Sequence, residues 1–442
     1  MASQIMVVRG MRDVLPDEQK YWTKIQEAAK RRFQSFGFQR IDTPVIESQA
    51  LYLRGTGQTT DIVTKELFGV SRLGNRVEEG SEGDSEPSEQ LVLRPEGTPG
   101  LVRAYIDHGM HTWPQPVKLF SFMPMFRYDR PQKGRYRQHT QLDVEVLGDE
   151  APLTDAMTIL VLWQLLQDLG LDTDAVIELN SLGDSASHDA INQGLRTYFQ
   201  PHLTSLSALS QERFKTNPLR ILDSKDSEDQ PFLEKAPQIV DFLNETSRTH
   251  FMTVLEYLDE AGVPYDLNPF LVRGLDYYTH TVFEIRDRTD DRRQASLASG
   301  GRYDQLVEQL GGQATPAFGF GMGIERIVAK MIEKHLPADP EPGTEILIIQ
   351  LGDRAKKKAI PLLVSLSKRG LAISMALGKE SLKSQLRSAD HMGAKLALIV
   401  GEREAIDGTI IVRNMHDSTQ ETIDFSDIER VVDTRLADLA NA

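Results

Sequence analysis

Residues 126–148 read FRYDRPQKGRYRQHTQLDVEVLG, and this stretch decides the predicted fold of the first part of the chain. Proline and glycine mark a turn in its first half, and apolar and polar residues alternate in its second half. The pattern predicts a β-hairpin with a positively charged loop and with carboxylate and amide groups on its strands. Such a hairpin can hold phosphates and an amino acid in one site.

Cationic side chains occur in this hairpin and in two distant segments. Guanidinium groups bind phosphate oxygens in pairs and keep their charge, so they suit a polyphosphate. For any one arginine alone, a solvated charged surface is the commoner explanation. The whole pattern predicts that arginines from three separate segments bind one triphosphate. The residues are Arg127, Arg130, Lys133, Arg135 and Arg137 in the hairpin, Arg273 in RGLDYYT, and Arg326 after GFGMGIE.

Polar residues follow the cationic loop at every second position. Gln141, Asp143 and Glu145 therefore share one face of the predicted strand. An acidic face beside an arginine-rich turn fits a ligand that carries an ammonium group next to a phosphate. An exposed polar face of an antiparallel sheet explains the spacing equally well.

The glycine-rich segment GFGMGIER runs from a predicted strand into a predicted helix. It lacks the lysine and the serine or threonine that end a P-loop, and it lacks the register of a dinucleotide fingerprint. We interpret its small residues as room for a nucleotide base beside the strand.

Composition limits the class of protein. The chain of 442 residues exceeds what one core usually supports, so two or three domains are expected. A net charge of -15 argues against nonspecific coating of nucleic acid, and no DNA partner is expected. Without cysteine there is no disulfide, thiolate nucleophile or Cys-ligated zinc. No signal peptide or membrane span is recognised, which predicts a cytoplasmic protein.

Several segments differ in pattern. Residues 17–37 predict an amphipathic helix, and FQRIDTPVIE, with Pro44 inside, predicts an edge or interface strand. A further apolar helix is expected at about 155–171.

The acidic stretch between Gly74 and Gln90 is too polar to bury much surface and predicts a disordered tip. After a proline-rich linker, strands and helices alternate, which predicts parallel strands covered by helices.

Seven pieces together carry a resemblance to a known family. They are RIDTPVIE, TTDIVTKELF, LRPEGT, FRYDRPQKGRYRQ with QLDVEVLG, LVRGLDYYTHTVFEI, GGRYDQL and FGFGMGIERI, in this order. They resemble the class II histidyl-tRNA synthetases over nearly the whole chain. The resemblance implies a homodimer that pairs through RIDTPVIE. It implies an α+β catalytic domain on an antiparallel sheet at 1–333, with a helical insertion at about 183–268, a linker at 334–344, and a small α/β anticodon-binding domain at 345–442.

The reaction that the resemblance implies is ATP-dependent ligation of L-histidine to tRNA(His) through a histidyl-adenylate. Mg2+ is expected with ATP, and no protein-ligated metal is predicted. A regulatory subunit of histidine biosynthesis without aminoacylation is the main alternative, against which RGLDYYT and the C-terminal segment argue. A class II synthetase for another amino acid is a third possibility, against which RGLDYYT and QLDVE argue.

Site residues are implied position by position. Arg127 and Arg273 are the expected catalytic residues at the α-phosphate, and Arg135 and Arg326 complete the ATP-binding set. His139 stands where the family has an aromatic residue that stacks on adenine. The cationic loop, with Arg130, Gln132 and Lys133, is expected at the acceptor end of the tRNA. The expected histidine-binding residues are Glu96, Gly97, Thr98, Gln141, Glu145, Tyr277 and Tyr278.

Overall fold

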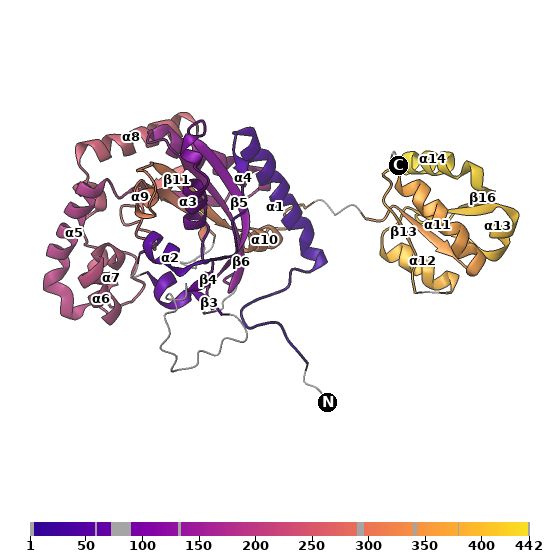
Figure 1. Ribbon diagram of the computed structural model, residues 1–442, viewed down its shortest axis with the longest axis horizontal. Coiled ribbons are helices and arrows are strands. Elements are labelled where there is room, and N and C mark those ends of the chain that lie inside the picture. Colours follow the sequence, from indigo (N-terminus) through magenta and orange to yellow (C-terminus); the bar gives the residue numbers. More distant parts are fainter. Residues whose placement is uncertain are drawn as a thin grey trace, which may run out of the picture. The chain divides into compact units, whose positions relative to one another are not determined.

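The computed structural model describes residues 4–57, 60–71, 90–130, 134–289, 296–338, 343–378 and 380–440. It divides into two compact units, Met1–Ala338 and Asp339–Ala442, which are described separately (Figure 1). The predicted acidic tip, the loop residues Gln132 and Lys133, and part of the predicted linker lie outside the described residues. Among the described helices, none combines the length and the apolar content that a membrane crossing requires.

The first unit is built on an eight-stranded sheet in the order β1-β5-β6-β11-β10-β9-β7-β8. Its five inner pairings are antiparallel, as predicted. The two outer pairings, β1 with β5 and β8 with β7, are parallel, so the sheet is mixed. Parallel neighbours need a long crossover, which the chain supplies in both cases. The strands are β1 (Gln39–Arg40), β5 (Val117–Phe126), β6 (Gln138–Leu147), β7 (Ala175–Ser181), β8 (Tyr265–Leu267), β9 (Thr279–Asp287), β10 (Ser296–Arg302) and β11 (Ala317–Gly323).

The predicted hairpin is formed by β5 and β6, which pair from Val117↔Leu147 to Phe126↔Gln138. Leu142, Val144 and Val146 of β6 enter the largest hydrophobic core. Because side chains alternate along a strand, the intervening polar residues lie on the opposite face. The hairpin thus separates the core from a polar surface.

Four helices pack against the core face of the sheet. Phe33, Phe120 and Phe320 join residues of these helices in one buried cluster. The amphipathic helix predicted near the N-terminus is confirmed, with Asp17 and Glu18 in its first turn, where carboxylates favour the helix dipole. The apolar helix predicted near residue 155 is also confirmed. The helices are α1 (Pro16–Ser35), α4 (Pro152–Leu169), α8 (Glu245–Glu260) and α10 (Ile324–Glu333).

A second core lies beneath the other helices and includes Tyr277, Tyr278 and Tyr303. Figure 1 shows α5, α6 and α7 gathered at the end of the unit away from α1. The helix α8, although it falls inside the segment predicted as an insertion, packs against α4 and belongs to the first core. The remaining helices are α2 (Gln49–Gly55), α3 (Thr98–Asp107), α5 (Ser185–Phe199), α6 (Ala208–Thr216), α7 (Gln230–Leu233) and α9 (Leu306–Gln309).

The first unit also contains a small sheet in the order β2-β4-β3. It consists of β2 (Ile46–Ser48), β3 (Phe68–Val70) and β4 (Leu91–Leu93). Pro44 lies between β1 and β2, and both are edge strands, which confirms the edge strand predicted for FQRIDTPVIE. A π-helix, Ile62–Glu66, lies within TTDIVTKELF.

The second unit contains a five-stranded sheet in the order β13-β12-β14-β15-β16. Its first three strands are parallel, as predicted, and β15 and β16 add antiparallel pairs. The last strand was not predicted because its side chains are mostly exposed and carry no apolar alternation. The elements are β12 (Ile346–Gln350), α11 (Asp353–Ser367), β13 (Ile373–Met375), α12 (Leu382–His391), β14 (Leu396–Val400), α13 (Glu402–Asp407), β15 (Thr409–Asn414), β16 (Gln420–Asp424) and α14 (Ile428–Ala440).

Candidate active site

A cavity of about 430 Å³ opens on the polar side of the central strands of the first unit. Residues from β6, β9, β10 and β11 line it, together with the loops around Glu96 and Arg273 and with the segment that contains Glu66. Arginines from the three predicted segments line this cavity. The residues expected from the sequence that line this cavity are Glu96, Thr98, Arg127, Arg135, His139, Gln141, Arg273, Tyr277, Tyr278 and Arg326.

Glycines of β11 make room for the polar side chains of β6. Gly319 pairs with Glu145, and Gly321 pairs with Asp143. A Cβ atom on Gly319 would overlap the Glu145 carboxylate, and one on Gly321 would overlap the Gln141 carboxamide. The glycine-rich motif therefore has a packing reason that its sequence did not reveal. Space for a nucleotide base beside it stays a prediction.

Glu96 places a buried carboxyl group on the cavity wall. Its Oε2 accepts a hydrogen bond from the hydroxyl of Tyr277 at 3.1 Å, and its Oε1 is buried without a partner among the described residues. Burial raises the pKa of Glu96 to about 7, against the opposing effect of Arg127. A buried carboxylate oxygen without a donor suits a cationic ligand group.

Glu145 lies behind the wall and does not line the cavity. Its Oε1 accepts a hydrogen bond from the hydroxyl of Thr98 at 2.7 Å, and its Oε2 accepts one from Tyr303. Burial raises the pKa of Glu145 to about 8. Direct contact between Glu145 and the substrate stays a prediction. Tyr303 was overlooked as a site residue, although it lies within GGRYDQL.

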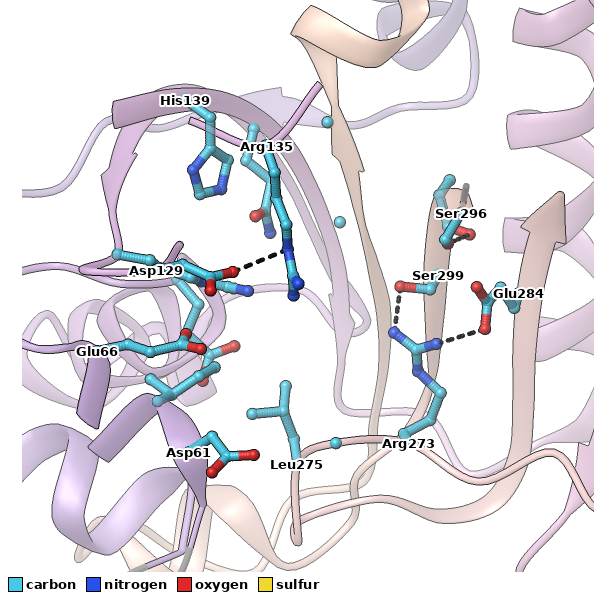
Figure 2. A pocket seen from close by; sticks show the side chains of 18 of the residues that line it. Asp61, Glu66, Asp129, Arg135, His139, Arg273, Leu275, Glu284, Ser296 and Ser299 are labelled. Carbon is cyan, nitrogen blue, oxygen red and sulfur yellow. Dashed lines mark hydrogen bonds and ion pairs between the residues drawn. The ribbon is translucent and has the colours of Figure 1, made fainter. Parts of the chain in front are cut away.

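The arginines on the two sides of the cavity are held by different partners. Nε of Arg127 donates to the carbonyl oxygen of Pro95 at 2.8 Å. Arg135 pairs with Asp129 at 2.9 Å. Figure 2 shows Arg135 and Arg273 on opposite sides of the cavity, where Arg273 bonds to Glu284 (3.0 Å) and Ser299. Anchored guanidinium groups are preorganised for phosphate.

The remaining predicted cations divide between the cavity and the surface. Arg326 lines the cavity, and its Nη1 donates to the carbonyl oxygen of Ser296 at 2.5 Å. The guanidinium of Arg137 stacks on Tyr128, 3.8 Å from the ring centroid, and does not line the cavity. Arg130 is exposed, and Lys133 lies outside the described residues. Among the described cations of the hairpin loop, Arg127 and Arg135 therefore line the cavity, whereas Arg130 and Arg137 do not.

Sequence reasoning missed several residues that line the cavity. The helical insertion supplies cations there, and Nη2 of Arg220 also donates to the carbonyl oxygen of Gly274 at 2.5 Å. Asp61, Glu66, Asp129, Glu284 and Glu325 lie in pieces that carried the family resemblance, which marked those segments as important without assigning these residues a role. The overlooked lining residues with charged side chains are Asp61, Glu66, Asp129, Arg213, Arg220, Asp223, Lys225, Glu284 and Glu325.

His139 lies in the cavity wall as a neutral imidazole. Burial and, to a lesser extent, the charges of Arg127 and Arg326 together lower its pKa to about 3. Protonation near neutral pH therefore does not oppose contact with an aromatic base. Stacking of His139 on adenine stays a prediction.

Comparison with protein families agrees with this geometry. Residues 10–327 match the family described as histidyl-tRNA synthetase. The chain belongs to the histidyl-tRNA synthetase family. Residues 345–435 match the family described as anticodon binding domain. The resemblance carried by the seven sequence pieces is confirmed, as is the class II synthetase fold.

Individual members of the histidyl-tRNA synthetase family align along almost the whole chain. The histidine–tRNA ligase of Thermosynechococcus vestitus is 42% identical over 405 residues, which cover 92% of this chain and 91% of that protein. The ligase of a Cyanothece species is 41% identical and covers 96% of this chain and 95% of its own length. The crystal structure of apo histidyl-tRNA synthetase from S. aureus is 33% identical, with a TM-score of 0.78, 96% coverage of this chain and 98% of that chain.

Proposed function

We propose that this histidyl-tRNA synthetase family member is a histidine–tRNA ligase, which joins L-histidine to ATP as histidyl-adenylate and then transfers histidine to tRNA(His). The observation that supports the assignment most strongly is the convergence of Arg127, Arg273 and Arg326 on one cavity beside the buried Glu96. The cations match a triphosphate, and the carboxylate matches the ammonium group of an amino acid. Full-length similarity to histidine–tRNA ligases supports the same conclusion.

In the first step, the histidine carboxylate attacks the α-phosphorus of ATP and pyrophosphate leaves. The attacking group belongs to the substrate, so the chain contributes position and charge. Arg127 and Arg273 act on the α-phosphate, and Arg135 and Arg326 hold the outer phosphates. ATP arrives as its Mg2+ complex, in which phosphate oxygens hold the ion.

The amino acid is selected by polar groups on the acidic side of the cavity. Glu96, Thr98 and Gln141 receive the α-ammonium group. The Tyr278 hydroxyl hydrogen-bonds to the imidazole. Tyr277, beside Tyr278, and Glu145, behind Thr98, belong to the same imidazole site. An amino acid with an aliphatic side chain leaves these buried polar groups unpaired, which costs binding energy.

The tRNA contacts both units. In the second unit, the exposed side chains Lys356, Lys357, Lys358 and Arg387 are candidates for binding near the anticodon, and a fifth candidate, Lys379, lies outside the described residues. In the first unit, the insertion cations at the cavity suit the acceptor end. The protein acts as a cytoplasmic homodimer that pairs through the segment around Pro44. These assignments of the tRNA and of the second subunit as partners are inferred from the family relationship.

The regulatory-subunit alternative lacks a specific observation in its favour. Such a subunit needs neither a triphosphate site nor an anticodon-binding domain. This chain brings Arg273 of RGLDYYT to the cavity and matches the anticodon-binding family over residues 345–435. Aminoacylation is therefore the better-supported function.

The decisive experiment is amino-acid-dependent exchange of labelled pyrophosphate into ATP, measured with every standard amino acid. Exchange is expected with L-histidine alone, because the site pairs polar groups with an imidazole. Exchange with another amino acid would indicate a sister synthetase. Its absence with all of them would contradict a ligase.

Histidine affinity should rise with pH through the neutral range. Burial raises the pKa values of Glu96 and Glu145 to about 7 and about 8, and a bound ammonium group favours their ionised forms. As pH falls through these values, the free enzyme takes up protons that the ligand must displace, so binding weakens. We expect the dissociation constant for histidine to be about tenfold larger at about pH 6.5 than at about pH 8.

Isothermal titration calorimetry in two buffers of different ionisation enthalpy measures this effect, because histidine binding should release protons. The matched variant Glu96→Gln removes one titrating group and should give a shallower dependence. Affinity that stays constant or increases at lower pH would contradict the linkage.

A further inference from the structure

Asp143 occupies the middle of the polar row on β6 and is fully buried. Its Oδ1 accepts a hydrogen bond from Nε2 of Gln141 at 2.5 Å. Its Oδ2 is buried and has no hydrogen-bond partner among the residues that the structure describes. Removing a carboxylate from water is costly, so a buried one at this place calls for a specific use.

The surrounding backbone leaves space for this side chain. A Cβ atom on Gly97 would overlap the Asp143 carboxylate. A Cβ atom on Gly321, the partner of Asp143 across the sheet, would overlap the Gln141 carboxamide. Gly97, which the sequence placed in the histidine site, therefore accommodates Asp143 and lies outside the cavity lining. Gly97 and Gly321, which lie on different elements, thus leave room for the hydrogen-bonded side chains of Gln141 and Asp143.

The pair defines which end of the carboxamide faces the ligand. An ionised carboxylate only accepts hydrogen bonds, so it draws the NH2 group of Gln141 toward itself. Oε1 is then the end that remains to accept from an ammonium group, whereas the reversed amide would present its own donors.

We propose that Asp143 is a positioning residue for the amino-acid substrate, which holds the Gln141 carboxamide with Oε1 directed toward the α-ammonium group. This inference rests on the proposed histidine-activating function. Burial raises the pKa of Asp143 to about 7, while the hydrogen bond from Gln141 and the charge of Arg94 lower it. A cationic ligand nearby favours the ionised, accepting form still further.

The test compares Asp143→Ala with Asp143→Asn in histidine-dependent pyrophosphate exchange by the full-length protein. Alanine removes the acceptor, and we expect at least about a tenfold increase in KM for histidine, with KM for ATP within about twofold of wild type. Asparagine keeps an acceptor oxygen and should recover most of the affinity. In a Gln141→Ala background, Asp143→Ala should have no further effect, because no carboxamide remains to be held.

Three results would overturn the proposal: an unchanged KM for histidine in Asp143→Ala, equal damage by asparagine and alanine, or additive effects of the Asp143 and Gln141 substitutions. Equal damage would mean that the negative charge itself matters. Thermal unfolding of each variant checks the fold, and loss of a desolvated carboxylate should not lower the midpoint. Failure of the wild-type protein to exchange with histidine would instead refute the proposed function, so the two failures are distinguishable.

Discussion

Replacing Arg127 by glutamine is expected to lower kcat for histidine-dependent pyrophosphate exchange by about 10²–10³-fold. The bond from its Nε to the carbonyl oxygen of Pro95 orients the guanidinium before any ligand arrives. Charge grows on the phosphoryl oxygens as the histidine carboxylate attacks, and glutamine cannot balance it. Arg127→Lys keeps the charge but loses the paired donors, so it should fall between glutamine and wild type.

Arg137→Gln is the matched control, because Arg137 belongs to the same hairpin but stacks on Tyr128 away from the cavity. It should retain exchange activity within about threefold of wild type, because its guanidinium does not line the cavity. Equal losses at Arg127 and Arg137 would indicate general damage to the hairpin. Full activity of Arg127→Gln would contradict its role at the α-phosphate.

Deleting residues 345–442 is expected to abolish most charging of tRNA(His) while sparing amino-acid activation. The cavity is built entirely from the first unit, which has its own hydrophobic cores. Pyrophosphate exchange should therefore stay within a few-fold of the full-length protein. Loss of one of two linked tRNA contacts typically reduces affinity by about 10²–10⁴-fold. Charging measured at subsaturating tRNA should fall accordingly.

Two measurements separate this loss from misfolding. The truncated protein should keep its thermal unfolding transition and its exchange activity. Raising the tRNA concentration should partly restore charging, because the first unit retains the acceptor-end contacts. Normal charging at low tRNA concentration would show that the second unit is dispensable for recognition.

Local patterns predicted the elements that carry the site. Alternation through Gln141, Asp143 and Glu145 was sufficient to place three polar side chains on one strand face, and the turn residues around Gly134 predicted the hairpin. Strand periodicity depends on nearest neighbours along the chain, which a sequence displays directly. The convergence of Arg127 and Arg273 came from the family resemblance as much as from pattern.

Other features depend on contacts between segments far apart in the chain. Tyr303 bonds to Glu145 across 158 positions, and Arg220 reaches the loop at Gly274 from the helical insertion. The family resemblance covered Tyr303 without giving it a role, and Arg220 has no sequence signal, because an isolated arginine is usually a surface residue. The strand β8 and the parallel pairing of both outer strands were not predicted, because strands of two or three residues leave almost no periodic trace.

The glycines beside β6 imply a limit on how this enzyme can be redesigned for other amino acids. Side chains introduced at Gly97, Gly319 or Gly321 would displace an acid or an amide from the wall before they reached the guest molecule. Libraries that aim to broaden the accepted amino acids should therefore leave these three glycines unchanged and diversify Tyr277 and Tyr278, which line the cavity. Positions around this pocket therefore differ in how well they tolerate substitution, and the three glycines tolerate it least.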